Sequence, residues 1–114
     1  MFRRSAARLL AVPPLSAPAV TSALLTLPGW KMDGNSTRHI ERDLLFVDFV
    51  AAMKFMQEVA PVCEKMGHHP MWLNVYNRVH VKLTTHDAGN AVSQKDVDLA
   101  KVMNETYAKY TKKK

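Results

Sequence analysis

Four of the chain's five histidines lie between Glu64 and Asp87, and two of them are adjacent, in the stretch EKMGHHPMWLNVYNRVHVKLTTHD. Imidazole changes its charge near neutral pH more readily than any other unperturbed side chain, and it is also a common metal ligand. Three interpretations of this clustering are open: a metal site, an acid–base site, or a coincidence of surface histidines.

The pattern of residues 71–86 predicts a β-hairpin, because apolar and polar residues alternate on both sides of a turn signal. Centring the turn on Asn77 places Leu73 opposite Val81 and Val75 opposite Val79. Residues that face each other across an antiparallel pair share one face of the sheet, so this register gathers the aliphatic side chains on the core side.

In that register His68 lies opposite His86, at the end of the hairpin that adjoins the preceding helix. His69 precedes a proline and is held extended, so its side chain should leave in another direction. His80 lies roughly 20 Å away along the strand, at about 3.3 Å per residue. We interpret His80 and His39 as exposed strand residues outside the site.

The spacing of the histidines favours acid–base chemistry over metal binding. Adjacent His68 and His69 are poorly disposed to bind one ion, and the chain has no H-x-H or H-x-x-x-H spacing. Free imidazole has a pKa of about 6.5, so one ring can be neutral while another is charged. An elimination or dehydration needs both, an acid for the leaving oxygen and a base for a ring proton.

Other reaction classes find no support in the sequence. There is no P-loop, no G-x-G-x-x-G and no G-x-S-x-G. The single cysteine, Cys63, excludes an internal disulfide and a multi-cysteine zinc site, and its place on an apolar helix face predicts a small buried residue. No apolar run approaches the roughly 20 residues that a membrane-spanning helix needs.

The elements that precede the histidines can be predicted from the same patterns. Residues 16–27 should form a short helix that begins at an N-cap, Ser16. An extended segment at 30–32, a turn at DGNS and a return strand over 38–45 should form a first hairpin.

A long helix should then deliver the chain to the histidines, ending at Gly67. Pro61 is expected to kink this helix or to end its regular part. The last helix is predicted over 93–110, with Ser93 as its N-cap. Spacing at i, i+3, i+4 and i+7 gives the long helix one apolar face, made of Phe46, Phe49, Val50, Met53, Met56, Ala60 and Cys63.

This order of elements predicts an α+β fold, a four-stranded antiparallel sheet with three helices packed on one face. The other face of the sheet would be uncovered, and we expect Trp72 and Tyr76 to be exposed on it. Exposed apolar area of this kind usually marks an interface, so a homodimer or homotetramer is expected.

The net charge of +6 belongs to the two ends of the chain. Residues 1–32 and residues 109–114 each contribute +4, whereas residues 33–108 hold eight basic and ten acidic residues. The globular body is therefore slightly acidic, and neither a nucleic-acid partner nor a membrane partner is predicted.

The first 15 residues contain three arginines and no acidic residue, which is typical of a mitochondrial transit peptide. The alternative is a basic extension on a cytoplasmic protein. The predicted organisation is thus an extension or transit peptide over 1–15, one domain over 16–110 and a lysine tail over 111–114.

The sequence resembles the pterin-4a-carbinolamine dehydratases. This family includes the dimerisation cofactor of a homeodomain transcription factor. The resemblance covers about residues 28–108. It rests on an acidic residue four positions before HHP, an aromatic residue, NVYN, THD and an aspartate near the start of the last helix. The matching residues are Glu64, His68, His69, Pro70, Trp72, Asn74 to Asn77, Thr85 to Asp87, and Asp96.

The resemblance implies a dehydratase without metal or organic cofactor. Its substrate would be a 4a-hydroxytetrahydropterin, the carbinolamine left by an aromatic amino-acid hydroxylase, and its products would be quinonoid dihydropterin and water. Functional coupling to such a hydroxylase follows. The alternatives within the family are a protein-binding role with a transcription regulator and a dehydratase for another pterin.

The resemblance also implies roles for single residues. His68 and His86 would be the general acid and base, and His69 would hold the pterin. Glu64 and Asp96 would orient the imidazoles. The implied substrate-binding residues are His68, His69, Pro70, Trp72, Thr85, His86, Asp87 and Ala88.

Overall fold

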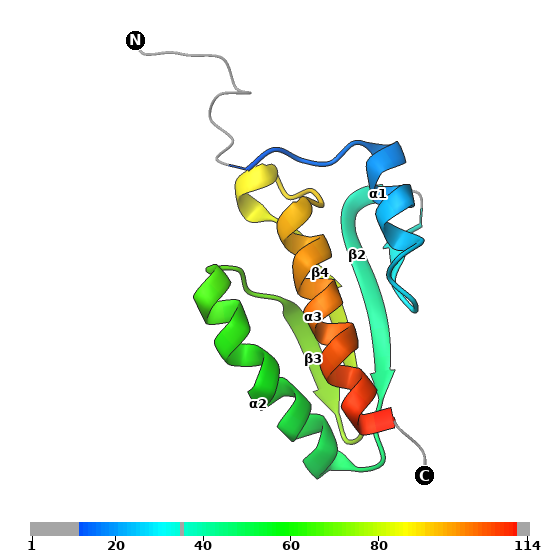
Figure 1. Cartoon of the computed structure of the whole chain (residues 1–114), viewed down its shortest axis with the longest axis vertical. Helices are drawn as coiled ribbons and strands as arrows, with labels where there is room; N and C mark the ends of the chain where they lie inside the picture. The colour runs from blue at the N-terminus through cyan, green and yellow to red at the C-terminus, as the bar shows by residue number, and fades with distance from the viewer. Residues whose placement is uncertain (1–11, 35, 112–114) are drawn as a thin grey trace.

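Two strands before the long helix and two after it pair into one antiparallel sheet, in the order β1-β2-β4-β3 (Figure 1). The computed structural model describes residues 12–34 and 36–111. Helices α2 and α3 lie along the same side of this sheet, and α1 lies beside the start of β2. The predicted α+β fold is confirmed. The elements are α1 (Ala17–Leu24), β1 (Lys31–Asp33), β2 (Ser36–Leu45), α2 (Phe49–Met66), β3 (Met71–Val75), β4 (Arg78–Leu83), the 3₁₀ helix η2 (His86–Ala88) and α3 (Gln94–Thr111).

The core lies between the helices and one face of the sheet. Strand alternation turns Ile40 and Leu44 of β2 toward the helices, together with Val79, Val81 and Leu83 of β4, and all five are buried. Apolar side chains from all three α-helices complete this cluster. They include Val20 of α1, Phe55 and Val59 of α2, and Leu99 and Met103 of α3.

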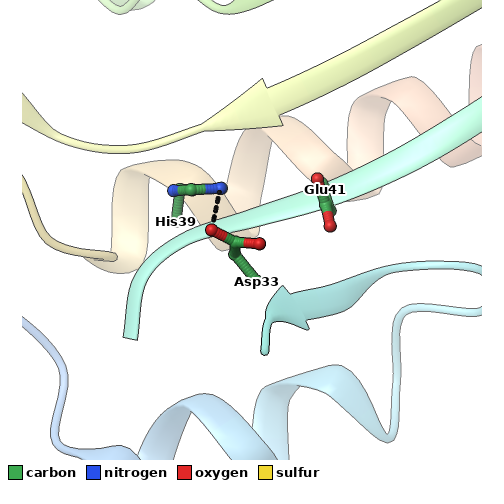
Figure 2. A group of neighbouring side chains, drawn as sticks. All are labelled: Asp33, His39 and Glu41. Carbon is green, nitrogen blue, oxygen red and sulfur yellow. Dashed lines mark ion pairs between the residues drawn. The ribbon is translucent and has the colours of Figure 1, made fainter. Parts of the chain in front are cut away.

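The opposite, outer face of the sheet carries polar side chains near the first hairpin. His39, Glu41 and Asp43 alternate with the buried residues of β2 and so point away from the helices. Asp33 of β1 lies beside two of them, His39 and Glu41 (Figure 2). His80 of β4 contacts this row from the neighbouring strand.

Helix α1 begins as predicted, because the Ser16 hydroxyl accepts a hydrogen bond from the Ala19 backbone N–H at 3.2 Å. The residue before this cap also takes part in the fold. Leu15 donates its backbone N–H to the Val92 carbonyl at 2.8 Å and packs against the core. Leu15, which the predicted organisation assigns to the N-terminal extension, therefore contributes to the packed domain.

The buried face of α2 differs from the predicted one. It consists of Ala52, Phe55, Val59 and Cys63, whereas Phe49, Val50 and Ala60 of the predicted face are exposed. The reason lies at the start of the helix. Phe46 is buried, but it precedes the N-cap Asp48 and reaches the core from the connecting segment, with its ring 5.2 Å from that of Phe55. Phe46 therefore cannot be used to predict which face of α2 is buried.

Helix α2 continues through Pro61 to Met66, so the expected end of its regular part at the proline is wrong. Pro61 lies on the exposed side, where water can satisfy the carbonyl that loses its intrahelical partner. The predicted stop at Gly67 is confirmed: this residue has φ of 63° and caps the helix.

The register of the β3–β4 hairpin is shifted by one residue from the predicted one. Trp72 pairs with Val81 and Leu73 with His80, so the turn comprises Tyr76 and Asn77. Trp72 consequently packs against the core, and the expectation that it lies on the outer face is wrong. Three aliphatic side chains of β3 point outward instead: Met71, Leu73 and Val75, which are 61–68% exposed.

Polar contacts at the turn account for this register. The Asn77 backbone carbonyl accepts from the Phe46 N–H at 2.8 Å, and the Asn77 side-chain amide donates to the Phe46 carbonyl at 3.0 Å. The Asn74 amide donates to the carbonyls of Tyr76 and Arg78. These bonds place Tyr76 at φ of 52°, a conformation that asparagine or glycine adopts more easily. Aliphatic alternation alone does not reveal them.

Among residues 12–34 and 36–111, no helix combines the length and the apolar character required to cross a membrane.

Candidate active site

The end of α2 determines where His68 lies. The left-handed conformation of Gly67 lets its N–H donate to the Glu64 carbonyl, while the His68 N–H donates to the Cys63 carbonyl at 3.0 Å. This pair of bonds closes the helix and turns the chain inward. His68 leaves the helix almost fully buried, with 6% of its surface exposed.

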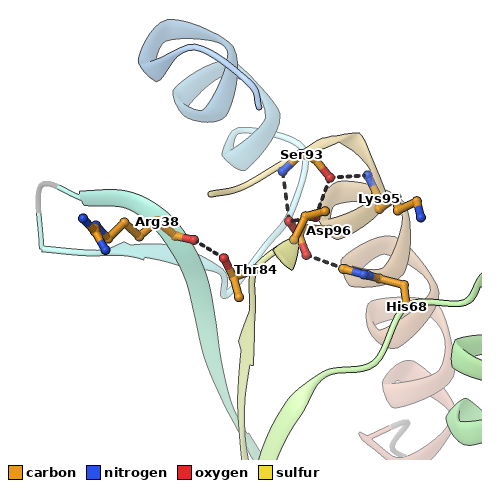
Figure 3. A network of polar contacts seen from close by, with 7 residues as sticks. Arg38, His68, Thr84, Ser93, Lys95 and Asp96 are labelled. Carbon is orange, nitrogen blue, oxygen red and sulfur yellow. Dashed lines mark hydrogen bonds and ion pairs between the residues drawn. The ribbon is translucent and has the colours of Figure 1, made fainter. Parts of the chain in front are cut away.

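Buried His68 is paired with a fully buried carboxylate. Its Nε2 lies 2.6 Å from Oδ1 of Asp96, in the first turn of α3 (Figure 3). The other oxygen, Oδ2, accepts from the Thr85 hydroxyl at 2.7 Å and from the Ser93 backbone N–H at 2.9 Å. Ser93 in turn accepts the Lys95 N–H on its hydroxyl, so it caps α3 as predicted.

This network defines the protonation of the pair. Thr85 and Ser93 both donate to Asp96, and the positive end of the helix dipole lies beside it, so the carboxylate is stabilised as an acceptor. An acceptor carboxylate requires the proton to sit on Nε2 of His68. The remaining ring nitrogen, Nδ1, is then the one that can exchange a proton with a ligand.

His86 reaches the site from η2, just beyond β4. The loop around it is closed by backbone bonds from Thr85 N–H to the Ala91 carbonyl and from Asn90 N–H to the Thr85 carbonyl. Nδ1 of His86 lies 2.9 Å from Oδ1 of Asn90. With that nitrogen donating to the amide oxygen, Nε2 of the exposed ring is left as the proton acceptor.

His69 occupies a third position, on the exposed rim. Its Nε2 lies 2.9 Å from Oε1 of Glu64, one turn before the end of α2, and both side chains are largely exposed. This contact orients the ring, and the exposure of both side chains keeps its energetic contribution small.

The three histidines line one cavity of about 280 Å³. The shared position does not come from strand pairing, because β3 pairs with β4 only from Met71 onward and the predicted opposition of His68 and His86 is wrong. The end of α2 and the loop after β4 bring the rings together instead. The other lining residues are Gly67, Thr84, Thr85, Asp87, Asn90 and Lys95.

Several residues of the predicted site lie elsewhere. Trp72 packs against the core and Ala88 is buried, and neither lines this cavity. Glu64 acts on the cavity only through its contact with His69. Pro70 lines a second cavity of about 300 Å³, which adjoins the first through His69 and Thr84 and also includes His39, Met71 and Lys82.

Sequence reasoning missed four lining residues: Gly67, which was predicted only as the end of the long helix, and Thr84, Asn90 and Lys95. Lys95 brings an ammonium group to the cavity from the residue next to Asp96, and Asn90 takes φ of 59° in the turn before α3. Thr84 donates its hydroxyl to the Arg38 carbonyl at 2.5 Å, which ties the cavity wall to β2 (Figure 3). The tripeptide after HDA, Gly-Asn followed by Ala, is a turn signal that could have identified Asn90.

The arrangement suits proton transfer. One imidazole is fixed by a buried carboxylate and another is exposed on the same polar cavity. The only thiol is poorly suited to attack, because burial raises the pKa of Cys63. The site therefore offers two positioned proton carriers.

Comparison with known proteins gives one consistent result. The family model described as pterin 4 alpha carbinolamine dehydratase matches residues 13–106, an earlier start than the expected residue 28. A relative from Afipia carboxidovorans is 45% identical over 84% of this chain and 94% of its own length. A relative from a Bradyrhizobium species is 50% identical over 79% of this chain and 89% of its own. Both carry a provisional name as pterin-4-alpha-carbinolamine dehydratases.

A solved structure agrees with these relatives. The crystal structure of a protein from Brucella melitensis, described as a transcriptional coactivator/pterin dehydratase, superposes with a TM-score of 0.77 at 40% identity. The alignment covers 82% of this chain and 98% of that one. From the fold, the histidine cavity and these matches together, the chain belongs to the pterin 4 alpha carbinolamine dehydratase family.

Proposed function

We propose that this chain catalyses the dehydration of a 4a-hydroxytetrahydropterin to quinonoid dihydropterin and water. The observation that carries this proposal is the pairing of His68 with buried Asp96 on the same cavity as His86. The reaction would regenerate the pterin oxidised by an aromatic amino-acid hydroxylase. Family membership supports the substrate class.

The chemistry requires two proton transfers and no redox step. The C4a–O bond breaks and the hydroxyl leaves as water with a proton from one imidazolium. A neutral imidazole takes a proton from the pterin ring, and the electron pair released forms the new C=N bond. His68 and His86 fill these two roles, and proton exchange through water resets the pair. Thr85, Asp87 and the rim residue His69 line the cavity, and in this proposal they contact the ring.

The direct test measures turnover of 4a-hydroxytetrahydropterin above its uncatalysed rate. We expect His68→Ala and His86→Ala each to lower the rate by roughly 10²–10⁴-fold, the usual contribution of a general acid or base. His80→Ala is the matched control, because that ring lies on the outer face of the sheet. A wild-type chain without turnover, or two cavity variants as active as wild type, would refute the proposal.

We also propose that the chain forms homo-oligomers through its β3 edge. β3 is an edge strand, and Met71, Leu73 and Val75 expose apolar surface along its outer side. Two sheets joined edge to edge would cover this surface, and helix contacts could then pair dimers into tetramers. Light scattering should show a dimer or tetramer for the wild type and a smaller species for Leu73→Lys. A wild-type monomer at micromolar concentration would rule this out.

Finally, we propose that the N-terminal segment directs the protein to mitochondria. The arginines that motivate this, Arg3, Arg4 and Arg8, lie outside the described residues. Residues 1–15 fused to a fluorescent protein in a eukaryotic cell should produce a mitochondrial signal, and replacing the three arginines with glutamine should abolish it. An entirely cytosolic signal from the unaltered fusion would contradict the proposal.

A further inference from the structure

Three side chains capable of binding metal converge on the outer face of the sheet, at the β1–β2 hairpin. Asp33 belongs to β1, and His39 and Glu41 belong to β2 (Figure 2). One nitrogen or oxygen from each lies within 4.8 Å of the others. None of the three lines the histidine cavity, although His39 lines the second cavity beside it.

One nitrogen of the His39 ring lacks a hydrogen-bond partner in this cluster. Its Nε2 is shielded from solvent and has no hydrogen-bond partner. The nitrogen lies 3.2 Å from Oδ2 of Asp33, but the geometry of that contact is not that of a hydrogen bond. Buried polar atoms are nearly always bonded, so an exception indicates a missing partner such as an ion.

The carboxylates of the cluster also lack strong cationic partners. Glu41 is paired in the sheet with Lys31 and with Lys82, yet neither lysine forms an ion pair with it among the described residues. Its oxygen lies 3.3 Å from Nε2 of His80, and that ring is shared with Asp43 at 2.6 Å. The two carboxylates of the cluster therefore lie close together, and each contacts an imidazole.

We propose that Asp33, His39 and Glu41 bind a divalent transition-metal ion of the zinc class. Two carboxylates and a neutral imidazole neutralise its charge, and nitrogen with carboxylate oxygen is a donor set that zinc accepts. Zinc–ligand bonds of about 2.0–2.2 Å in a tetrahedron hold donor atoms roughly 3.4 Å apart. The Asp33–His39 pair is already at 3.2 Å, so only the Glu41 side chain has to move closer.

The ion would join two strands near the turn of their hairpin, with water in the fourth position. Such a link stabilises the hairpin because the ion binds the folded arrangement and not the unfolded chain. This proposal is independent of the dehydration chemistry, because none of the three residues lines the histidine cavity.

The test uses the full chain without an affinity tag, stripped of metal with a chelator and titrated calorimetrically with ZnSO₄. We expect one high-affinity ion per chain and a rise in melting temperature. His39→Ala and Asp33→Asn should each weaken binding by at least about tenfold, since even the loss of outer-shell partners costs about 10–100-fold. Asp33 is half exposed, so its variant should fold and provide a test even if His39→Ala does not.

Two controls locate the ion. Asp43→Asn removes a carboxylate of the same strand outside the cluster and should leave zinc affinity unchanged. His86→Ala removes a cavity histidine and should also leave it unchanged. Equal zinc affinity in wild type, His39→Ala and Asp33→Asn would overturn the proposal. Failure of the wild type to bind zinc at millimolar concentration, or loss of binding in His86→Ala alone, would overturn it too.

Discussion

Asp96 is the residue that joins the candidate site to the fold. Its two oxygens contact His68 just beyond α2, Thr85 just beyond β4 and Ser93 at the N-cap of its own helix. A carboxylate that is fully removed from water is stable only when such partners satisfy it. The same four groups therefore hold the site together and orient the His68 ring.

At this scale we predict that Asp96→Ala destabilises the protein by about 1–3 kcal/mol, because it leaves the buried donors of His68, Thr85 and Ser93 without their acceptor. Asp98→Asn, on the exposed side of the same helix, should stay within about 0.5 kcal/mol of wild type. Urea unfolding measures both. An Asp96→Ala chain as stable as wild type would show that the network contributes little.

The sequence predicted individual residues of the site better than their contacts. His68, His69 and His86 were predicted to belong to one site, and all three line one cavity. The hydroxyl of Thr85 and the amide of Ser93 were not foreseen as partners of Asp96. Their positions depend on how a loop closes and how a helix begins, and neither follows from residue spacing.

Among the elements, the end of α2 depends on one residue in the left-handed conformation, Gly67. Gly67 has φ of 63°, and a Cβ added there would meet no atom within 4 Å. Gly67→Ala should therefore cost only the conformational penalty of the left-handed region, about 1–2 kcal/mol. Gly67→Asn should cost less, because asparagine adopts this region more easily. Chemical denaturation of both variants checks the order, and equal losses would contradict it.

A second contact between elements predicts a dependence on pH. The Tyr110 hydroxyl donates to Glu58 of α2, and this bond, with desolvation and the nearby charge, raises the pKa of Tyr110 to about 12. The same bond, with a contribution from Lys109, lowers the pKa of Glu58. Stability from the raised tyrosine is complete below its unfolded pKa of about 10 and declines as pH rises toward 12.

The check compares urea midpoints of wild type and Tyr110→Phe at several pH values. The advantage of the wild type should be constant between about pH 5 and about pH 10, and it should shrink above that range as the tyrosine ionises. Tyr76→Phe, at the exposed hairpin turn, should match the wild type throughout. If the difference in stability between wild type and Tyr110→Phe stays the same above about pH 10, the bond to Glu58 is not the cause of that difference.

Sequence patterns predicted which elements form more reliably than which face each buries. Ser16, Ser93 and Gly67 mark helix ends through local bonds, and the structure has helix boundaries there. The face of α2 and the register of β3 depend on distant contacts, those of Phe46 with Phe55 and of Asn77 with Phe46. The alternation of aliphatic residues therefore does not predict a hairpin register that is determined by the hydrogen bonds of an asparagine.

For the molecule as a whole, Leu15 marks where the packed part of the described chain begins. A chain that starts at residue 16 should be less stable than one that starts at residue 12, by about 0.5–1.5 kcal/mol for the lost bond to Val92. Both should keep full dehydratase activity, since Leu15 does not line the cavity. Thermal or urea unfolding compares them, and equal stability would show that the Leu15 contacts are dispensable.

The pairing of β2 with β4 has a consequence for how the chain folds. Each hairpin joins neighbours in sequence, but the β2–β4 ladder, which runs from Leu45 with Arg78 to Ile40 with Leu83, can form only after the whole of α2 has been looped out. Such long-range closure is slow compared with local turns. His68 lies inside that loop and Asp96 beyond it. The hairpins should therefore form early in folding, while the contact between His68 and Asp96 assembles only in the late, rate-limiting event.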